Sequence, residues 1–344
     1  MIYISWDGVE MKKESSSLYD LALRFYEEGR RAIVPLFGYC GLHFTGTTIK
    51  QNQFNHLVQF SSLSRLYDRF CPDAMFFLMD LSVEASALGL PVRFPLEETP
   101  SVEAHLVKSK NDLDKFRKID ILGDGRIIIY LETLKHMRAA FPCPVGAYVI
   151  GPLTLSGLLM GANELAIKSI IEPDFLEEVL EFSHQVIMRY AQALRENGAE
   201  SIMILDPTAV IFGPQQFRQT ASRFYRELVG IMDDVEITLH VCGDTSHLLK
   251  EMVHSGVAGL SLDSLVNMKK ASQVVGENTL LIGNINPVKM LFGSPQEIYD
   301  ETWNLLDSMR DFPPFILSTG CDLPQDVPLE NIDAFFQAGR NWKR

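Results

Sequence analysis

A histidine and a cysteine stand two residues apart in the segment TLHVCGD (238–244), where a run of apolar residues ends. In a β-strand, residues i and i+2 point to the same face, so His240 and Cys242 would be directed at one point. An imidazole and a thiolate are typical zinc ligands. The pair is weakly informative alone, because a buried cysteine is often only a small apolar side chain. The fold decides what else lies beside it.

Short apolar runs recur along the chain, separated by polar or Gly/Pro breaks and by amphipathic helical stretches. Most of them are continuously apolar, as expected for strands that are covered on both faces. Helical patterns lie between them, for example over 173–198 and 294–311, with Pro or Ser near their starts. The eight apolar runs are residues 32–38, 74–80, 145–151, 201–207, 237–243, 259–263, 280–285 and 315–321.

Eight strands that alternate with helices predict a (β/α)₈ TIM barrel of the α/β class. The chain of 344 residues is longer than a typical barrel, and much of the excess falls in the first 30 residues and in 81–144. We therefore predict an N-terminal extension over 1–30 and a single catalytic barrel over 31–344. A doubly wound open sheet is the alternative. Neither G-x-G-x-x-G after an early strand nor G-x-x-x-x-G-K-[ST] occurs, so a nucleotide-binding fold is unsupported.

Active sites of barrel enzymes lie at the C-terminal ends of the strands. Cys321 ends the last apolar run, and Asp263 ends the run that follows the His-x-Cys pair. One imidazole, two thiolates and one carboxylate make a plausible tetrahedral zinc site, and thiolates favour zinc over magnesium or calcium. The polar residues at the strand ends are Asp80, Asp206, His240, Cys242, Asp263, Asn284, Asn286, Cys321 and Asp322.

Three further carboxylates near the strand ends are candidates for catalysis. Asp206 either positions a substrate or serves as a helix N-cap or structural carboxylate. Asp80 and Glu84 are candidates for donating a proton to a leaving group. If a helix starts there, their i, i+4 spacing places them on one face, where like charges favour solvation over function.

Three other side chains are candidates for substrate binding. Asn284 and Asn286 either form hydrogen bonds near the rim or turn the chain before Pro287. Tyr148 faces either the core or a pocket. The sequence pattern does not choose between these alternatives.

Composition and charge exclude several classes of function. The formal net charge of −13 argues against nucleic acid as a partner and against adsorption to anionic membranes. The uncharged stretch 144–163 contains two Pro and four Gly, so we expect a strand, a loop and a helix start rather than a membrane span. Five scattered cysteines form no disulfide framework, and the N-terminus shows no signal-peptide pattern. We predict a cytoplasmic enzyme.

Several segments together resemble a known family. The most specific are LHVCG (239–243), GLSLD (259–263), IGNINP (282–287) and STGCDLPQDVPLENIDAFFQA (318–338). Over most of its length the chain resembles the zinc-dependent corrinoid methyltransferases that are related to uroporphyrinogen decarboxylase. These include methylcobalamin:coenzyme M methyltransferases and the methyltransferase components of O-demethylases.

The resemblance implies a uroporphyrinogen decarboxylase-like barrel whose catalytic zinc is bound by His240, Cys242 and Cys321. An acidic residue at the position of Asp263 can fill the fourth zinc site in the family, and Asp stands here where Glu also occurs. We expect Asp263 to occupy that site at rest and to leave it when substrate binds. The corrinoid (cobalamin) is carried by a separate corrinoid-binding protein, which docks over the C-terminal rim.

The resemblance leaves the direction of methyl transfer open. In one direction a thiol attacks the methyl group of a methyl-Co(III) corrinoid. In the other, Co(I) takes the methyl group of a small methylated donor such as a methyl ether, and we slightly favour this O-demethylating direction. A metal-free uroporphyrinogen decarboxylase is the weaker alternative, because PLFGYCGLHFTG (35–46) lacks the Arg cluster by which that enzyme holds its substrate carboxylates.

Overall fold

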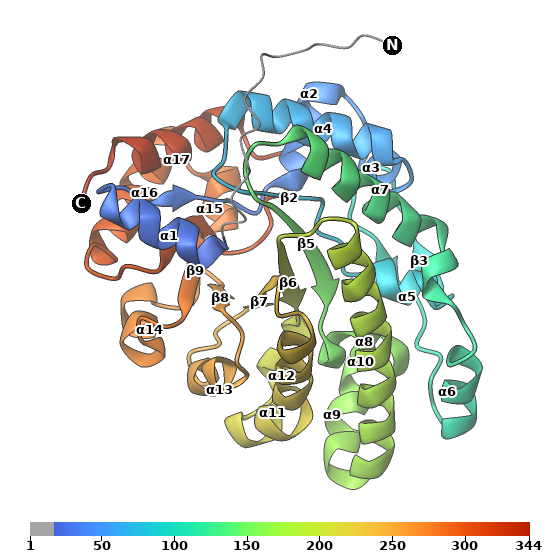
Figure 1. The fold of residues 1–344 in the computed structure, drawn as a ribbon. Coiled ribbons are helices and arrows are strands. Elements are labelled where there is room, and N and C mark those ends of the chain that lie inside the picture. Colours follow the sequence, from blue (N-terminus) through green and yellow to red (C-terminus); the bar gives the residue numbers. More distant parts are fainter. Residues whose placement is uncertain (1–16) are drawn as a thin grey trace.

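The computed structural model describes residues 17–344, which form a curled, eight-stranded parallel sheet surrounded by helices (Figure 1). The order of the strands in the sheet is β1-β10-β9-β8-β7-β6-β5-β2. Each strand coincides with one of the eight predicted apolar runs, so the predicted barrel is confirmed. The strands are β1 (Ala32–Ile33), β2 (Met75–Phe76), β5 (Val145–Ile150), β6 (Ser201–Leu205), β7 (Glu236–Val241), β8 (Gly259–Leu262), β9 (Leu280–Ile285) and β10 (Phe315–Thr319).

The helices pack around the outside of the sheet, and a short antiparallel hairpin of β3 (Val92–Arg93) and β4 (Ser101–Val102) lies in the long connection between β2 and β5. The helices are α1 (Leu18–Glu27), α2 (Leu42–Thr45), α3 (Ile49–Gln53), α4 (His56–Phe70), α5 (Val83–Ala87), α6 (Lys110–Phe116), α7 (Gly125–Ala140), α8 (Pro152–Met160), α9 (Ala162–Ile171), α10 (Pro173–Glu196), α11 (Pro214–Thr220), α12 (Ser222–Ile231), α13 (Leu249–His254), α14 (Met268–Val275), α15 (Pro287–Phe292), α16 (Pro295–Ser308) and α17 (Leu329–Asn341), with the 3₁₀ helices η1 (Gly38–Gly41), η2 (Ile121–Gly123) and η3 (Pro207–Ile211).

The strands are buried on both faces, which explains why their sequences are continuously apolar rather than alternating. All residues of β5, β6, β8, β9 and β10 are buried. Helix starts also follow the sequence pattern: α10 begins at Pro173, and Ser294 caps α16 through a capping box with Glu297. Apolar runs therefore account for the positions of the barrel strands, and Pro173 and Ser294 account for the starts of α10 and α16.

The barrel closes between its two shortest strands, β1 and β2, through one aspartate. The backbone N–H of Ile33 donates to Asp73 Oδ2 at 2.8 Å, and the N–H of Asp73 donates to the carbonyl of Ile33 at 3.0 Å. Asp73 lies two residues before β2, and its two hydrogen bonds join β1 to the start of β2, which do not pair with each other in the sheet. The seam is thus held by a side chain as well as by backbone.

Helix α1 packs against the barrel near the N-terminal ends of the strands. Its residues Leu18, Leu21 and Phe25 are buried in the main hydrophobic core. Glu236, at the start of β7, accepts hydrogen bonds from the N–H groups of Leu18 and Tyr19. The predicted boundary between an extension and the barrel at residue 30 stays a prediction, and residues 1–16 of that extension lie outside the described residues.

The uncharged stretch 144–163 forms the buried strand β5, the whole of α8 and the first residues of α9 rather than a membrane span. Among residues 17–344, no helix combines the length and the apolar character that crossing a membrane requires.

Candidate metal centre at the carboxyl ends of the strands

His240, Cys242 and Cys321 lie together at the carboxyl end of the barrel. His240 is in β7, Cys242 directly follows that strand, and Cys321 follows β10. His240 Nε2 is 3.1 Å from Cys242 Sγ, and Cys242 Sγ is 3.5 Å from Cys321 Sγ. One ligand atom from each of the three residues lies within 4.8 Å of the others. The three predicted zinc ligands are therefore brought together by strands that are far apart in the sequence.

Ser261, in the neighbouring strand β8, orients His240. The two residues are paired in the sheet register, and Ser261 Oγ lies 3.0 Å from His240 Nδ1. A hydrogen bond at Nδ1 holds the ring and leaves Nε2 for the cluster, as is usual for metal-binding histidines. Sequence reasoning missed Ser261, although a lone hydroxyl within the apolar run GLSLD was a signal for it.

The two thiols differ in their tendency to ionise. The hydrogen bond from Cys321 lowers the pKa of Cys242, while the same contact, together with burial, raises the pKa of Cys321. Of the two thiols, Cys242 is therefore the one whose ionisation this contact favours. One histidine nitrogen and two sulfurs with such short separations form a donor set that fits zinc.

Asp263 lies next to this cluster but does not belong to it. Its Oδ2 accepts the N–H of Gly243 at 2.9 Å, and its Oδ1 accepts the N–H of Leu265, also at 2.9 Å. The carboxylate thus ties the loop after Cys242 to the loop after β8. In this arrangement Asp263 supports the ligand loop, and its predicted role as a fourth or displaceable ligand stays a prediction.

Tyr148 and Asp322 lie close enough to Cys321 for its charge to act on both groups. Burial raises the pKa of Asp322, and the neighbouring Cys321 raises it further. Burial, followed by the charges of Asp322 and Cys321, also raises the pKa of Tyr148. The Tyr148 ring stacks on Phe76, with ring centroids 5.1 Å apart. The ring of Tyr148 therefore packs in the core, and its predicted contact with substrate stays a prediction.

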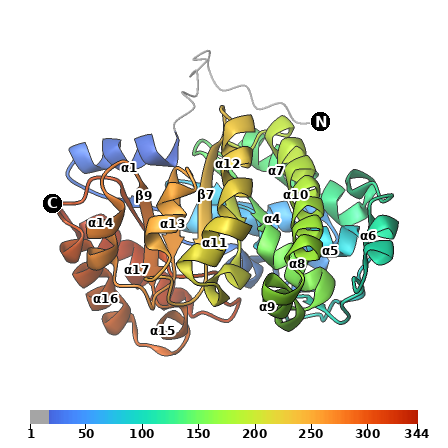
Figure 2. The ribbon, with the colours of Figure 1, turned by 90° about the horizontal axis from the view of Figure 1, so that it is seen from below.

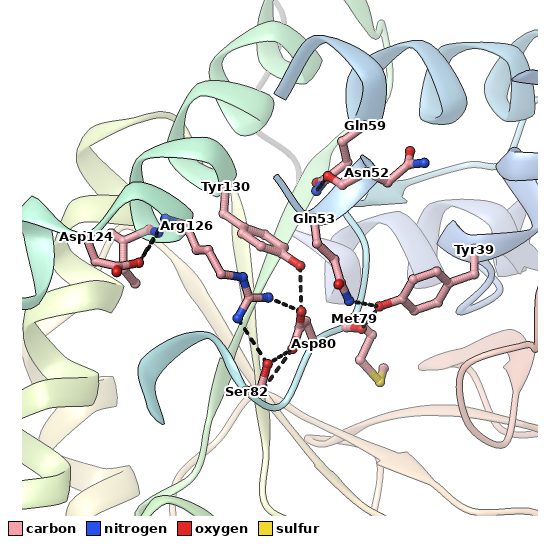
Figure 3. A network of polar contacts seen from close by, with 11 residues as sticks. Tyr39, Asn52, Gln53, Gln59, Met79, Asp80, Ser82, Asp124, Arg126 and Tyr130 are labelled. Atoms are coloured by element: carbon pink, nitrogen blue, oxygen red, sulfur yellow. Dashed lines mark hydrogen bonds and ion pairs between the residues drawn. The ribbon is translucent and has the colours of Figure 1, made fainter. Parts of the chain in front are cut away.

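Asp80 is buried and fully engaged by its neighbours, as Figure 3 shows. It forms an ion pair with the guanidinium of Arg126, and Tyr130 Oη donates to its Oδ2 at 3.1 Å. The N–H and hydroxyl of Ser82 donate to its Oδ1 at 2.8 and 2.7 Å. The expectation that Asp80 and Glu84 are solvated was wrong, because the sequence did not reveal the buried cation opposite Asp80.

Glu84 lies in α5 and is also buried. Its Oε1 accepts the N–H of Ile150 at 2.9 Å, which links α5 to the end of β5. Burial raises the pKa of Glu84 to about 7. A carboxyl group that titrates near neutrality is suited to proton transfer, yet every contact shown for Glu84 is structural, and its catalytic role stays a prediction.

Asp206 caps a helix that belongs to a different part of the chain. Its Oδ1 accepts the N–H and the hydroxyl of Thr154 at 2.7 and 2.6 Å, and Tyr225 Oη donates to its Oδ2 at 2.6 Å. The N-cap of α8 is Gly151, which has no side chain for capping, and a Cβ at this position would collide with the Asp206 carboxylate. These contacts match the structural alternative for Asp206, whose pKa is raised to about 6 by burial.

The side chains of Asn284 and Asn286 also form hydrogen bonds within the protein. The amide of Asn284 donates to the carbonyl oxygens of Asp263 and Val266 at 2.8 and 2.7 Å, which fixes the loop after β8. Asn286 is the N-cap of α15 and accepts the N–H of Val288 at 2.8 Å. Both therefore follow the turn-forming alternative, and their predicted contacts with substrate stay predictions.

Comparison with known proteins places this barrel in a family. The model of the uroporphyrinogen decarboxylase (URO-D) family matches residues 44–342. The chain therefore belongs to the URO-D family, and the resemblance to its methyltransferases is confirmed.

Two similar relatives carry the same name. A methylcobamide:CoM methyltransferase of Methanosarcina mazei is 30% identical over 77% of this chain and 78% of its own length, and one of Methanosarcina acetivorans is 29% identical over the same shares. A uroporphyrinogen decarboxylase of Paraburkholderia phytofirmans is 26% identical over 77% of this chain and 76% of its own length. The solved structure of a methyltransferase from Methanosarcina mazei has the same fold, with a TM-score of 0.83 at 23% identity over 94% of this chain and 98% of its own.

Proposed function

We propose that this chain is a corrinoid-dependent methyltransferase that moves a methyl group between the cobalt of a corrinoid and a small thiol. The observation that carries this proposal is the cluster of His240, Cys242 and Cys321 at the carboxyl end of the barrel. The relatives support it, because the names of two of them state an action on methylcobamide and coenzyme M.

Zinc is the metal we propose for the cluster, held by His240 Nε2 and by the sulfurs of Cys242 and Cys321. When bound there, zinc keeps a thiol substrate in its nucleophilic thiolate form near neutral pH. The protein supplies the rigidity. Ser261 holds the His240 ring, and Asp263 holds Gly243 and thereby the backbone beside Cys242.

The thiol-methylating direction is the one we propose. The thiolate attacks the methyl carbon of methyl-Co(III), the new carbon–sulfur bond forms, and the electron pair of the cobalt–carbon bond stays on cobalt as Co(I). A third relative, 24% identical over 75% of this chain and 70% of its own length, is named a methylated-thiol:coenzyme M methyltransferase, which again involves a thiol. The preference for the O-demethylating direction, taken from the sequence, stays a prediction.

The decarboxylase alternative is less well supported by the geometry. A tetrapyrrole with many carboxylates needs free cationic side chains at the rim. Arg126 lies near that end of the barrel, but Asp80 and Ser82 occupy two nitrogens of its guanidinium.

The test is a methyl-transfer assay with methylcobalamin and 2-mercaptoethanesulfonate. The change in the absorption spectrum of the corrinoid measures the rate. Wild type should demethylate methylcobalamin in a thiol-dependent reaction, and Cys242→Ala should lose at least about 10³-fold in rate, because it removes a ligand rather than an outer partner. Cys71→Ala, which removes an exposed thiol away from the cluster, is the matched control. Equal rates for Cys242→Ala and wild type would exclude the proposed site.

A further inference from the structure

A small cavity with many positive charges lies at the end of the barrel opposite the metal centre. Its volume is about 240 Å³, and the residues that line it come from the segments before β1 and β2 and from the end of α17. Its cationic lining residues are Arg30, Arg31, Arg340 and Lys343, and Cys71 and Asp73 also line it. We call this cavity the basic pocket.

The basic pocket lies at the seam of the sheet. Arg30 and Arg31 directly precede β1, and Asp73 joins β1 to the start of β2 through its hydrogen bonds with Ile33. Parallel strands start on the same side, so the pocket and the His/Cys cluster lie at opposite ends of the barrel. In Figure 2, α1, which ends shortly before Arg30, lies at the upper edge, and α15, which follows the carboxyl end of β9, lies at the lower edge.

The cations of the pocket have few acidic partners. Asp73 is the one carboxylate among the described lining residues. Its Oδ1 is 3.8 Å from Arg30 Nη1, beyond hydrogen-bonding distance, and Arg30 Nε bonds Glu28 at 2.8 Å instead. Burial raises the pKa of the Asp73 carboxyl, while the charges of Arg30, Arg340 and Arg24 oppose that shift. Three cations therefore act on a single carboxylate.

Arg31 is a buried cation without a carboxylate partner among residues 17–344. Its guanidinium donates to the carbonyl oxygens of Met309, Arg310 and Pro313, which are neutral. Its Nε is buried and has no hydrogen-bond partner in the described chain, and burial lowers the pKa of Arg31 to about 10. Buried charges are usually paired, because an uncompensated charge in the interior is costly. A bound anion would therefore offset positive charge that the protein leaves unpaired here.

Arg340 and Lys343 bring two further positive charges from the end of α17 and the residues after it. Arg340 Nη2 donates to the carbonyl of Phe70, the last residue of α4. This contact favours an anion, because the carbonyl groups at a helix C-terminus repel negative charge and a donor reduces that effect. Lys343 is exposed, and its ammonium forms no hydrogen bond or ion pair with residues 17–344.

We propose that the basic pocket binds a phosphate group, either as inorganic phosphate or as part of a small phosphomonoester. Guanidinium groups hold phosphate oxygens through charge-assisted hydrogen bonds, and a dianion matches several positive charges better than a monoanion does. The volume suits such a ligand, since a water molecule takes only about 30 Å³. The whole chain has a formal net charge of −13, so the positive charge of the pocket is a local feature. This site is independent of the proposed methyl-transfer function.

Cys71 provides a reporter for binding, because its exposed thiol lines the pocket. The full-length protein is treated with iodoacetamide, a neutral reagent, in increasing concentrations of inorganic phosphate at constant ionic strength. Mass spectrometry of the peptide that contains Cys71 gives the rate of its alkylation. Phosphate in the pocket should slow this alkylation in a saturable way, and titration calorimetry should give the same Kd.

Two variants test the cations. Arg30→Gln and Lys343→Gln each remove one positive charge from the pocket and should raise the Kd for phosphate about three- to tenfold, without a change in the unfolding midpoint. Lys118→Gln is the matched control and should bind phosphate as wild type does. It removes an exposed lysine beside α6, which lies across the molecule from α17 in Figure 1.

A comparison of anions identifies the ligand. Tighter binding of glycerol 3-phosphate than of inorganic phosphate would support a phosphomonoester, and the reverse order would support inorganic phosphate. If methanesulfonate, a monoanion, protects Cys71 as well as phosphate does, the effect is one of general charge and the proposal is overturned. The absence of saturable protection and of binding heat in wild type, or an unchanged Kd in both variants, would also overturn it.

Discussion

The two sides of the barrel rim use similar residues in different ways. At the ends of β7 and β10, His240, Cys242 and Cys321 contact mainly one another, and two of them are partly exposed. At the end of β2, Asp80 is buried and receives hydrogen bonds or an ion pair from three other side chains (Figure 3). Both groups are polar residues at the carboxyl ends of strands, which is where barrel enzymes keep their catalytic residues.

The difference shows what separates a reactive group from a structural one in this fold. The hydrogen-bonding capacity of Asp80 and Asp206 is largely filled by the protein, and their predicted catalytic roles stay predictions. A side chain whose partners are other ligands of the same cluster keeps that capacity. A position at the carboxyl end of a strand therefore identifies candidate functional residues. The number of hydrogen bonds that each one forms within the protein indicates which candidates are structural.

The largest expected effect is on metal binding. His240→Ala should reduce zinc from about one per chain to a small fraction of that, because the remaining sulfurs lack the nitrogen that completes the set. Elemental analysis of the purified proteins measures this. His247→Ala, on a histidine that contacts the carbonyl of Phe212 instead, should keep its zinc. Full zinc occupancy in His240→Ala would show that the cluster at the ends of β7 and β10 is not the metal site.

On the β2 side the largest effect should be on stability. Arg126→Leu leaves the buried Asp80 without its cation and should lower the free energy of unfolding by about 3–5 kcal/mol. Urea denaturation measures the change. Arg117→Leu breaks an exposed ion pair with Asp114 and should cost less than about 1 kcal/mol. Similar losses of unfolding free energy in the two variants would show that the buried Asp80–Arg126 pair stabilises the protein no more than an exposed pair does.

Glu84→Gln tests a buried carboxyl through pH. The folded-state pKa of about 7 lies above that of an unfolded glutamate, so the contribution of Glu84 to stability is fully present below the unfolded pKa and is lost as the pH rises through 7. The variant lacks that loss. Relative to wild type it should therefore gain on the order of 2 kcal/mol between pH 5 and pH 8, measured by urea unfolding.

The same variant also tests the role of Glu84. A structural Glu84 predicts that Glu84→Gln keeps most of its methyl-transfer rate, because glutamine retains an oxygen that can accept the N–H of Ile150. If Glu84 is instead a proton donor, Glu84→Gln should lose most of its methyl-transfer rate. The pH-dependent gain in stability should be the same in either case. Parallel stability curves for variant and wild type would show instead that Glu84 ionises normally.

The smallest effect should come from the partner of His240. Ser261→Ala removes the hydrogen bond at Nδ1 and should weaken zinc binding about tenfold without abolishing it. Competition with a chelator measures the affinity. Ser318→Ala, on a buried hydroxyl in β10 that has no partner among the described residues, should leave the affinity unchanged. An unaltered affinity in Ser261→Ala would show that packing alone orients the ring.

Much of the fold could be predicted because its signals are local. Apolar runs marked all eight barrel strands, and Pro173 and Ser294 marked helix starts. The site was predicted in part, since a spacing of two places His240 and Cys242 on one face of a strand. Ser261 was missed because its importance comes from a neighbouring strand, 21 residues away in sequence.

By itself the sequence determined the order of strands and helices, the end of the barrel where polar residues gather, and the chemical kind of ligand available there. Only the tertiary structure decided which of those polar residues are free to act. Asp80 meets Arg126 across 46 residues, and Asp206 meets Thr154 across 52. Burial makes an unpaired charge costly, so the partners that the fold supplies determine whether a carboxylate holds the protein together or is available for chemistry.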